Sequence, residues 1–232
     1  MVFTSLFILS LGMQTPSIAD WEEKFTDYLR SHADLEDGSH DLGHFQRVWK
    51  TAQLIDREDG LGADLLILLA AAYFHDLVAL PKNHPERSRS SLLSADKTAE
   101  LLVNTFTDFP AEKIEGVRHV IHAHSFSANI PTRTVEARIL QDADRLEALG
   151  AIGLARVFYT CGQLSQQLFD PVDPLADHRV PNDQVFALDH FSIKLLKLPD
   201  LMNTKAGRRL ADENADYLRG FLQKIRGEIL GI

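Results

Sequence analysis

One long apolar segment, residues 63–76, constrains the fold of this chain more than any other feature. Residues 65–72 within it carry only leucine, isoleucine and alanine side chains, and the segment is too long for a typical strand. Apolar residues recur at helical spacing along most of the remaining chain, whereas the alternation typical of strands is nearly absent. The sequence therefore predicts an all-α protein, a single helical bundle over residues 20–232 with residues 63–76 as its buried core helix.

Periodicity, together with proline and glycine, sets the boundaries of the expected helices. We expect helices over residues 20–32, 41–57, 63–76, 91–106, 110–124, 134–149, 184–198 and 204–229. Asp20 is the expected N-cap of the first helix, and Pro110 is expected at the first position of its helix. Gly150 and Gly153 are expected to interrupt the helix that ends at residue 149 or to tighten its packing. Residues 170–182 hold three prolines, which predicts a surface loop or lid.

Composition limits the kinds of protein that this chain can be. Its 232 residues carry a formal net charge of −9, which argues against a nucleic-acid-binding protein because such proteins need a basic surface. Cys161 is the single cysteine, so no disulfide can form within the chain, and we expect it to be a small buried side chain. The sequence does not indicate an oligomeric state.

Residues 1–19 form an N-terminal extension outside the predicted domain. Residues 2–13 are mostly apolar, but the Lys or Arg that precedes the apolar run of a signal peptide is missing. The run is also too short to span a bilayer as a helix. We expect either a translation start at Met13 or a short extra helix, in a cytoplasmic protein without a stable membrane span. An exported protein with a signal peptide is the alternative.

Three separated segments carry side chains that can bind a metal ion. His75 and Asp76 end the apolar helix, where a carboxylate beside an imidazole is costly unless it is paired or bound to a metal. His44 and Asp144 lie on two further predicted helices, and facing helices build metal sites from inward-pointing side chains. Two imidazoles and two carboxylates suit Mn²⁺, Fe, Co²⁺, Ni²⁺ or Zn²⁺ better than Mg²⁺. For His75 and Asp76 alone, a helix-end hydrogen bond without metal is the alternative.

These segments match the pattern of a known family. The chain resembles the HD-domain superfamily of metal-dependent phosphohydrolases in four motifs: Ser39-His40-Asp41-x-x-His44-x-x-Arg47-Val48, Phe74-His75-Asp76-Leu77, His124-Ser125-Phe126-Ser127 and Gln141-Asp142-Ala143-Asp144-Arg145-Leu146. Within this superfamily it is similar to a bacterial subgroup of small, stand-alone hydrolases, some of which are nucleotide pyrophosphohydrolases. Residues 189–191 and 194–198 also match that subgroup, so the resemblance covers roughly residues 20–230.

The resemblance implies hydrolysis of a phosphate ester or anhydride in a nucleotide or another small phosphorylated metabolite. It implies one divalent metal ion, with Mn²⁺ favoured, on His44, His75, Asp76 and Asp144, and leaves room for a second metal ion. Asp142 and Asp144 project about 200° apart on a helix, so both cannot face one metal. The Ala-Asp-x-Leu context of the family selects Asp144, and Asp142 would support a ligand or pair with a cation.

Further residues of the expected site carry charge or protons. Asp76 is the expected general base. His124 occupies a matching position of the subgroup and is expected to act as a general acid or to bind phosphate. Lys82, Asn83 and Arg87, which share one loop, and Arg145 are expected to bind the substrate. The alternative for Lys82 and Arg87 is that they are solvated loop residues.

The remaining polar residues near the motifs carry weaker expectations. His40 is expected to support the metal ligands by hydrogen bonding, and His119 and His122 to lie at the surface or at a helix end. Arg47 is expected to pair with the histidine one turn before it or to reach a phosphate, and Glu147 to bond to a ligand or orient a water. The alternatives for the whole chain are a nucleotide- and metal-binding module without turnover, and a relative of the di-iron HD oxygenases.

Overall fold

The structure, a computed structural model, describes residues 16–32, 41–78, 80, 84–125 and 128–231. Over these residues the chain is mainly helical and forms no β-strand, apart from one isolated bridge between Gln167 and Phe186. The predicted all-α class is confirmed. None of the described helices is long and apolar enough to cross a membrane.

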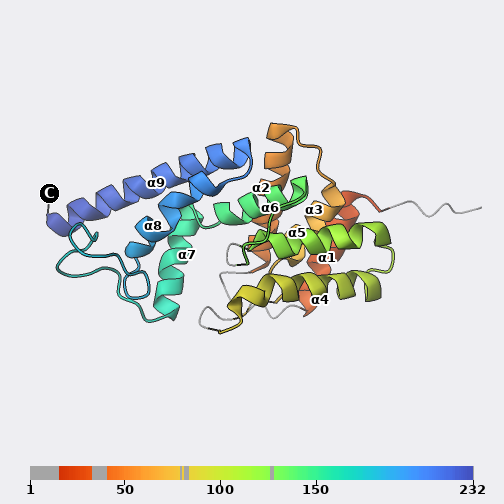
Figure 1. Cartoon of the computed structure of the whole chain (residues 1–232), viewed down its shortest axis with the longest axis horizontal. Helices are drawn as coiled ribbons and strands as arrows, with labels where there is room; N and C mark the ends of the chain where they lie inside the picture. The colour runs from red at the N-terminus through yellow and green to blue at the C-terminus, as the bar shows by residue number, and fades with distance from the viewer. Residues whose placement is uncertain (1–15, 33–40, 79, 81–83, 126–127, 232) are drawn as a thin grey trace, which may run out of the picture.

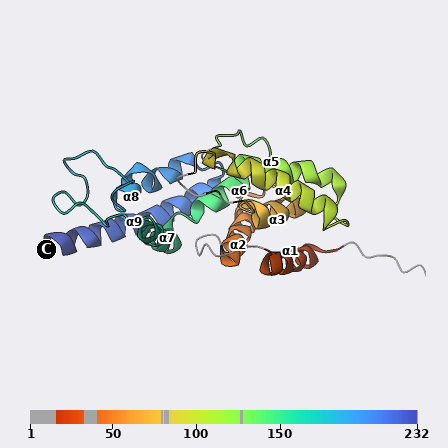
Figure 2. The ribbon, with the colours of Figure 1, turned by 90° about the horizontal axis from the view of Figure 1, so that it is seen from below.

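Helix α3 (Leu65–Phe74) lies at the centre of the fold, and residues 68–74 are fully buried. It packs against α1 (Ile18–His32), α2 (Leu42–Asp59), α4 (Ser90–Asn104), α5 (Ile114–His124) and α6 (Val135–Leu146). Figure 2 shows α3 and α6 between the α4–α5 pair on one side and α1 with α2 on the other. A helix without a polar face can be accommodated only inside such layers, because it has no side to present to water.

The C-terminal helices extend away from this bundle (Figure 1). The long helix α9 (Lys205–Leu230) contacts α2 and α6 near its start and packs against α7 (Gly150–Gln163). The short helix α8 (Asp189–Ile193) leads into a 3₁₀ segment, η3 (Leu195–Leu201), which also packs on α9. Two shorter 3₁₀ turns, η1 (Arg87–Arg89) and η2 (Ala111–Lys113), precede α4 and α5.

The start of α1 differs from the prediction that Asp20 is its N-cap. The helix begins at Ile18, and the backbone N–H of Ser17 donates to Asp20 Oδ2 at 2.7 Å while the backbone N–H of Asp20 donates to Ser17 Oγ at 3.2 Å. This is a capping box, in which the acidic residue lies three positions after the cap. The N-cap is therefore Ser17, and the helical domain starts inside the segment that we expected to be an extension.

Three further details of the helices differ from the prediction. The expected helix 184–198 is only the five residues of α8, because Phe186 pairs with Gln167 and Pro199 lies in the 3₁₀ segment that follows. Helix α7 was not expected from the sequence, and its first residue, Gly150, has a φ of +62°. Pro110 precedes η2 as its N-cap and is not its first residue.

Residues 170–182 form the expected loop, and its own carboxylates hold it in place. Asp170 accepts hydrogen bonds from two backbone N–H groups, and Asp173 accepts from three. Arg179 then donates to both carboxylate oxygens of Asp189, at 2.5 and 2.7 Å, and so ties the loop to α8. Cys161, at 3% exposure, is buried as expected.

Candidate metal centre

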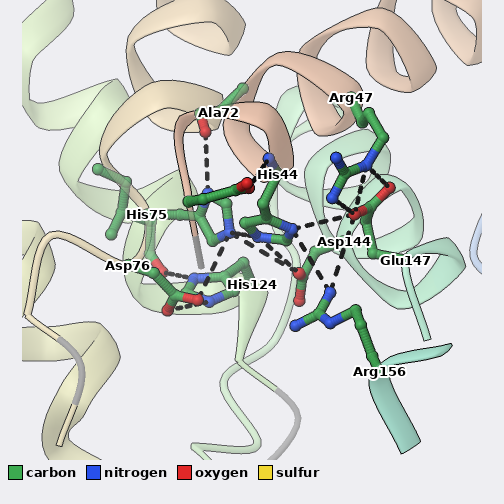
Figure 3. Close-up of polar contacts among 11 residues, drawn as sticks. His44, Arg47, Ala72, His75, Asp76, His124, Asp144, Glu147 and Arg156 are labelled. Carbon is green, nitrogen blue, oxygen red and sulfur yellow. Dashed lines mark hydrogen bonds and ion pairs between the residues drawn. The ribbon is translucent and has the colours of Figure 1, made fainter. Parts of the chain in front are cut away.

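The predicted metal-binding residues meet where α2, α3, α5 and α6 come together (Figure 3). Asp41 caps α2 by accepting from the backbone N–H of His44, which places this imidazole in the first turn. His75 is the C-cap of α3, and His124 is the last residue of α5. All three imidazoles are buried, with exposures of 0%, 0% and 5% for His44, His75 and His124.

The side chains approach one another closely enough to share one ion. His44 Nε2 and His75 Nε2 are 3.1 Å apart, and Asp144 Oδ1 is 3.7 Å from each of them. Asp76 Oδ2 is 3.8 Å from His75 Nε2. One ligand atom each from His44, His75 and Asp76 can be chosen so that all lie within 4.8 Å of one another, a spacing that could hold a metal ion.

The outer nitrogen of each imidazole faces an acceptor. His75 Nδ1 lies 2.9 Å from the Ala72 carbonyl, and His124 Nδ1 lies 2.5 Å from the Ile121 carbonyl. His44 Nδ1 lies 3.2 Å from Glu147 Oε2. A carbonyl oxygen and an ionised carboxylate can only accept, so Nδ1 carries the proton in all three, and a neutral imidazole then has its lone pair on Nε2.

The lone pairs on the two Nε2 atoms show whether these residues fit a metal. The Nε2 atoms of His44 and His75 face each other at 3.1 Å, where two lone pairs repel unless a proton or a cation lies beside both. Two carboxylates, Asp76 and Asp144, border the same point and offer further oxygen ligands. Imidazole nitrogens whose other nitrogen is bonded to a carbonyl or carboxylate are the usual form of protein metal ligands. The residues therefore fit a divalent transition metal.

The charges at this point act strongly on one another. Burial lowers the pKa of His75, but the carboxylates of Asp76 and Asp144 outweigh burial and raise it to about 9. Burial acts to raise the pKa of Asp144, but the hydrogen bond and charge of His75 hold it below the usual range. Burial lowers the pKa of His44 despite the Glu147 carboxylate. A cation is thus favoured at the centre, where His75 holds a proton in the metal-free protein.

Glu147 contacts the outer nitrogen of His44 and is itself held by arginines. Its Oε2 accepts from Arg47 Nη2 at 2.8 Å and Nε at 3.0 Å, and Arg156 Nη1 lies 3.8 Å from the same oxygen. Arg156 Nη1 is also 3.5 Å from His44 Nδ1. Burial acts to raise the pKa of Glu147, but the hydrogen bonds from His44 and Arg47 lower it, so this carboxylate stays ionised beside the imidazole.

Replacing Glu147 by glutamine tests this support. We expect Glu147→Gln to weaken Mn²⁺ binding by about 10- to 100-fold, because the amide cannot orient His44 as the carboxylate does. Isothermal titration calorimetry would measure the affinity. Glu115→Gln is the matched control, since Glu115 on α5 is 80% exposed. An unchanged Mn²⁺ affinity in Glu147→Gln would show that this contact does not support the ligand.

The structure also separates Asp142 from Asp144. Asp142 is 0% exposed and accepts hydrogen bonds from the backbone N–H groups of Asn203 and Thr204 and from the Thr204 hydroxyl, just before α9. It therefore joins α6 to the start of α9. Its charge also acts on the guanidinium of Arg145, in keeping with the second of the two roles that we expected, pairing with a cation. Asp144 faces the imidazoles, as the motif indicates.

The remaining predicted residues are placed as follows. Arg87 donates to the Leu80 carbonyl, and Arg145 Nη1 donates to the Leu201 carbonyl at 2.5 Å. His119 accepts from the backbone N–H of Arg133, and it lies, like His122, in a partly exposed position outside the cluster. Three residues that we assigned to the site lie outside the described residues: His40, Lys82 and Asn83.

Sequence reasoning did not identify Arg156 as part of the centre. It lies on α7, a helix without a recognisable motif, and is 112 positions from His44. Arg47 donates to Glu147, which in turn contacts His44, so Arg47 is linked to His44 through that carboxylate. The sequence did not decide which group Glu147 contacts.

The chain is similar in sequence and in fold to known proteins. The HD domain family matches residues 41–149. The protein YpgQ from Bacillus subtilis is 33% identical over 215 residues, which are 90% of this chain and 94% of YpgQ. A crystal structure of YpgQ in complex with ADP has a TM-score of 0.68 at 31% identity and covers 90% of this chain and 97% of its own. An HD-superfamily hydrolase from Bacillus thuringiensis has a TM-score of 0.69 at 29% identity, with coverages of 91% and 98%.

The family match includes the motifs and the helices that carry them. The residues of the HD domain region run from the cap of α2 to the end of α6, and they contain the histidine and aspartate cluster described above. The match with YpgQ covers at least 90% of each chain, so the similarity also includes the C-terminal helices. The chain belongs to the HD-domain superfamily, and within it the chain is similar to bacterial proteins such as YpgQ.

Proposed function

We propose that this protein is a metal-dependent phosphohydrolase that cleaves a phosphate ester or anhydride in a nucleotide. The observation that carries the proposal is the convergence of the Nε2 atoms of His44 and His75 and the carboxylates of Asp76 and Asp144 on one buried point. We assign these four residues as ligands of a single divalent ion, with Mn²⁺ favoured by the nitrogen and oxygen donor set.

The residues around that point divide the proton transfers between them. A bound divalent metal would supply Lewis acidity, lowering the pKa of a water molecule and polarising a phosphoryl oxygen. We propose that Asp76 accepts the proton of the attacking water, and its position between two imidazoles supports this role, with Oδ1 3.7 Å from His124 Nε2 and Oδ2 3.8 Å from His75 Nε2. As an imidazolium, His124 would keep one proton on Nδ1, bonded to the Ile121 carbonyl, and donate the other from Nε2 to the leaving oxygen.

Cations near the centre support binding of a phosphorylated substrate. The charges of Asp144, Arg87 and Arg145 all act on the ammonium group of Lys194, so these side chains share one neighbourhood. Burial of the ammonium group lowers the pKa of Lys194, although the residue as a whole is exposed. We propose that Arg87, Arg145 and Lys194, with Lys82 and Asn83 of the preceding loop, bind the phosphates.

A relative that binds a nucleotide supports the substrate class that we propose. YpgQ forms a complex with ADP, and it matches this chain over nearly its whole length. We propose a nucleotide as the substrate here. A panel of nucleoside mono-, di- and triphosphates, incubated with Mn²⁺ and assayed for phosphate and pyrophosphate, tests this. Metal analysis of the purified protein and its thermal shift with Mn²⁺ complete the test. A protein without metal, shift or turnover would contradict the proposal.

The two alternatives predict different results in the same experiments. A binding module without turnover would show a thermal shift with nucleotide but release no product. A di-iron oxygenase would need more histidine ligands, and among the described histidines only His124 joins His44 and His75, while His119 and His122 lie apart. An iron absorption band in the visible range would favour that alternative.

Binding of Mn²⁺ should depend on pH. Because the pKa of His75 is raised to about 9, this imidazole is protonated at neutral pH in the metal-free protein. A metal ligand must lose that proton, so we expect affinity to rise by up to about tenfold per pH unit from pH 7 and to level off above pH 9. Calorimetry in buffers of different ionisation enthalpy would count the proton released. A flat affinity over this range would contradict the assignment of His75.

A further inference from the structure

A cavity of about 450 Å³ lies between the residues that follow α5, the helix α6 and the residues that precede α9. Its lining includes Ser125, which follows His124, and Arg145, which follows Asp144. Gln141 lies on α6 about 60° around the helix from Asp144 and about 40° from Arg145, so the cavity begins where the metal-facing side of α6 ends. The volume lies in the range typical of small-molecule sites.

Hydrogen bonds fix the polarity of one wall of this cavity. Gln141 Nε2 donates to the Ala123 carbonyl at 2.9 Å, so its Oε1 is the acceptor for Asn203 Nδ2, also at 2.9 Å. Asn203 Nδ2 donates in addition to Asp142 Oδ1 at 2.8 Å. Both amide hydrogens of Asn203 are thus used within the wall, and the polar atom that remains on this side chain is the carbonyl oxygen, an acceptor.

The charge around the cavity does not suit a chain of phosphates. Among the described residues that line it, Arg145 alone is charged, and we assign this guanidinium to the phosphates at the metal centre because it directly follows Asp144. The rest of the cavity then has no charged side chain to bind a chain of phosphates. The other polar lining groups are neutral: the hydroxyls of Ser125 and Thr132 and the amides of Asn129, Gln141 and Asn203. Neutral donors and acceptors of fixed direction recognise sugar hydroxyls and the edge of a base.

We propose that this cavity binds the nucleoside half of the substrate, and that Asn203 Oδ1 accepts a hydrogen bond from an exocyclic amine of the base. This inference rests on the proposed function, since it places the remainder of a nucleotide whose reacting phosphate lies at the metal centre. A base with an amine, such as adenine, is preferred over one with a carbonyl at that position, because two facing acceptors would repel.

A variant that fills the cavity tests the assignment. Thr132→Trp occupies the nucleoside position, and Thr107→Trp, in an exposed turn between α4 and α5, is the matched control. With Mn²⁺, kcat/KM for ATP should fall by about tenfold or more in Thr132→Trp, while kcat/KM for inorganic triphosphate, which has no nucleoside, stays at the wild-type value. Unchanged ATP hydrolysis, or an equal loss for both substrates, would overturn the assignment.

A binding experiment keeps the inference separate from catalysis. Adenosine should give saturation-transfer NMR signals with the metal-free wild-type protein and with Thr107→Trp, and lose them with Thr132→Trp. The preference for adenosine over inosine should disappear in Asn203→Ala and persist in the exposed Asn104→Ala control. If wild type hydrolyses neither ATP nor triphosphate, the proposed function fails, yet adenosine binding still decides the cavity. Equal adenosine signals from wild type and Thr132→Trp would refute it.

Discussion

Asp76→Asn is expected to lower kcat for nucleotide hydrolysis by about 10³-fold while leaving the fold intact. Asparagine has nearly the same shape as aspartate, so the substitution leaves no cavity. The Asp76 side chain is also 17% exposed, so its surroundings are not fully buried. The amide cannot accept the proton of the attacking water, and it also removes the charge that raises the pKa of His75. Product phosphate measured at saturating Mn²⁺ and nucleotide would give kcat, and circular dichroism would report the fold.

The control for this variant is another aspartate of the same bundle. Asp96 on α4 pairs with Arg118 at the surface and is 46% exposed, so Asp96→Asn should keep wild-type kcat. Mn²⁺ content measured in parallel separates a lost base from a lost metal. If Asp76→Asn retained both its metal and a kcat within about twofold of wild type, Asp76 would not be the general base.

Substitutions of Asp142 and Asp144, two residues apart, should affect different properties: the first the stability of the fold, the second the binding of Mn²⁺. Asp142→Asn is expected to reduce the free energy of unfolding by about 3 kcal/mol, because its amide nitrogen would face the donors of Asn203 and Thr204. Mn²⁺ should still raise the melting temperature of this variant. Asp144→Asn is expected to abolish that Mn²⁺-induced rise, because a ligand oxygen at the centre is lost. Urea unfolding and thermal melts with and without Mn²⁺ measure both effects.

The metal-induced change in melting temperature provides an internal control for this pair. It compares each variant with itself, so a general loss of stability in Asp144→Asn does not enter the comparison. A Mn²⁺-induced rise in Asp144→Asn equal to that of wild type would remove Asp144 from the ligand set. A loss of that rise in Asp142→Asn, with Asp144 unchanged, would place the metal on the other side of α6.

Local patterns in the sequence were sufficient for the helical class and for the types of residue at the centre. The apolar run of α3 has no polar face, so only a buried central helix can accommodate it. His75 and Asp76 follow that helix directly, which brings an imidazole and a carboxylate to a buried helix end whatever the rest of the fold does. Helical geometry also predicts that Asp142 and Asp144 point in different directions.

Tertiary structure decided what those side chains contact. Asp142 meets the residues before α9, 61 and 62 positions later, and Glu147 meets His44 across 103 positions, so no local period contains either pairing. The same reason explains the missed α7 residue Arg156 and the incorrect helix at 184–198, where a contact between Gln167 and Phe186 overrides local preference. Sequence determined which groups are available for chemistry, because residue type and spacing are local. Packing determined which of them meet, because contacts between helices are not.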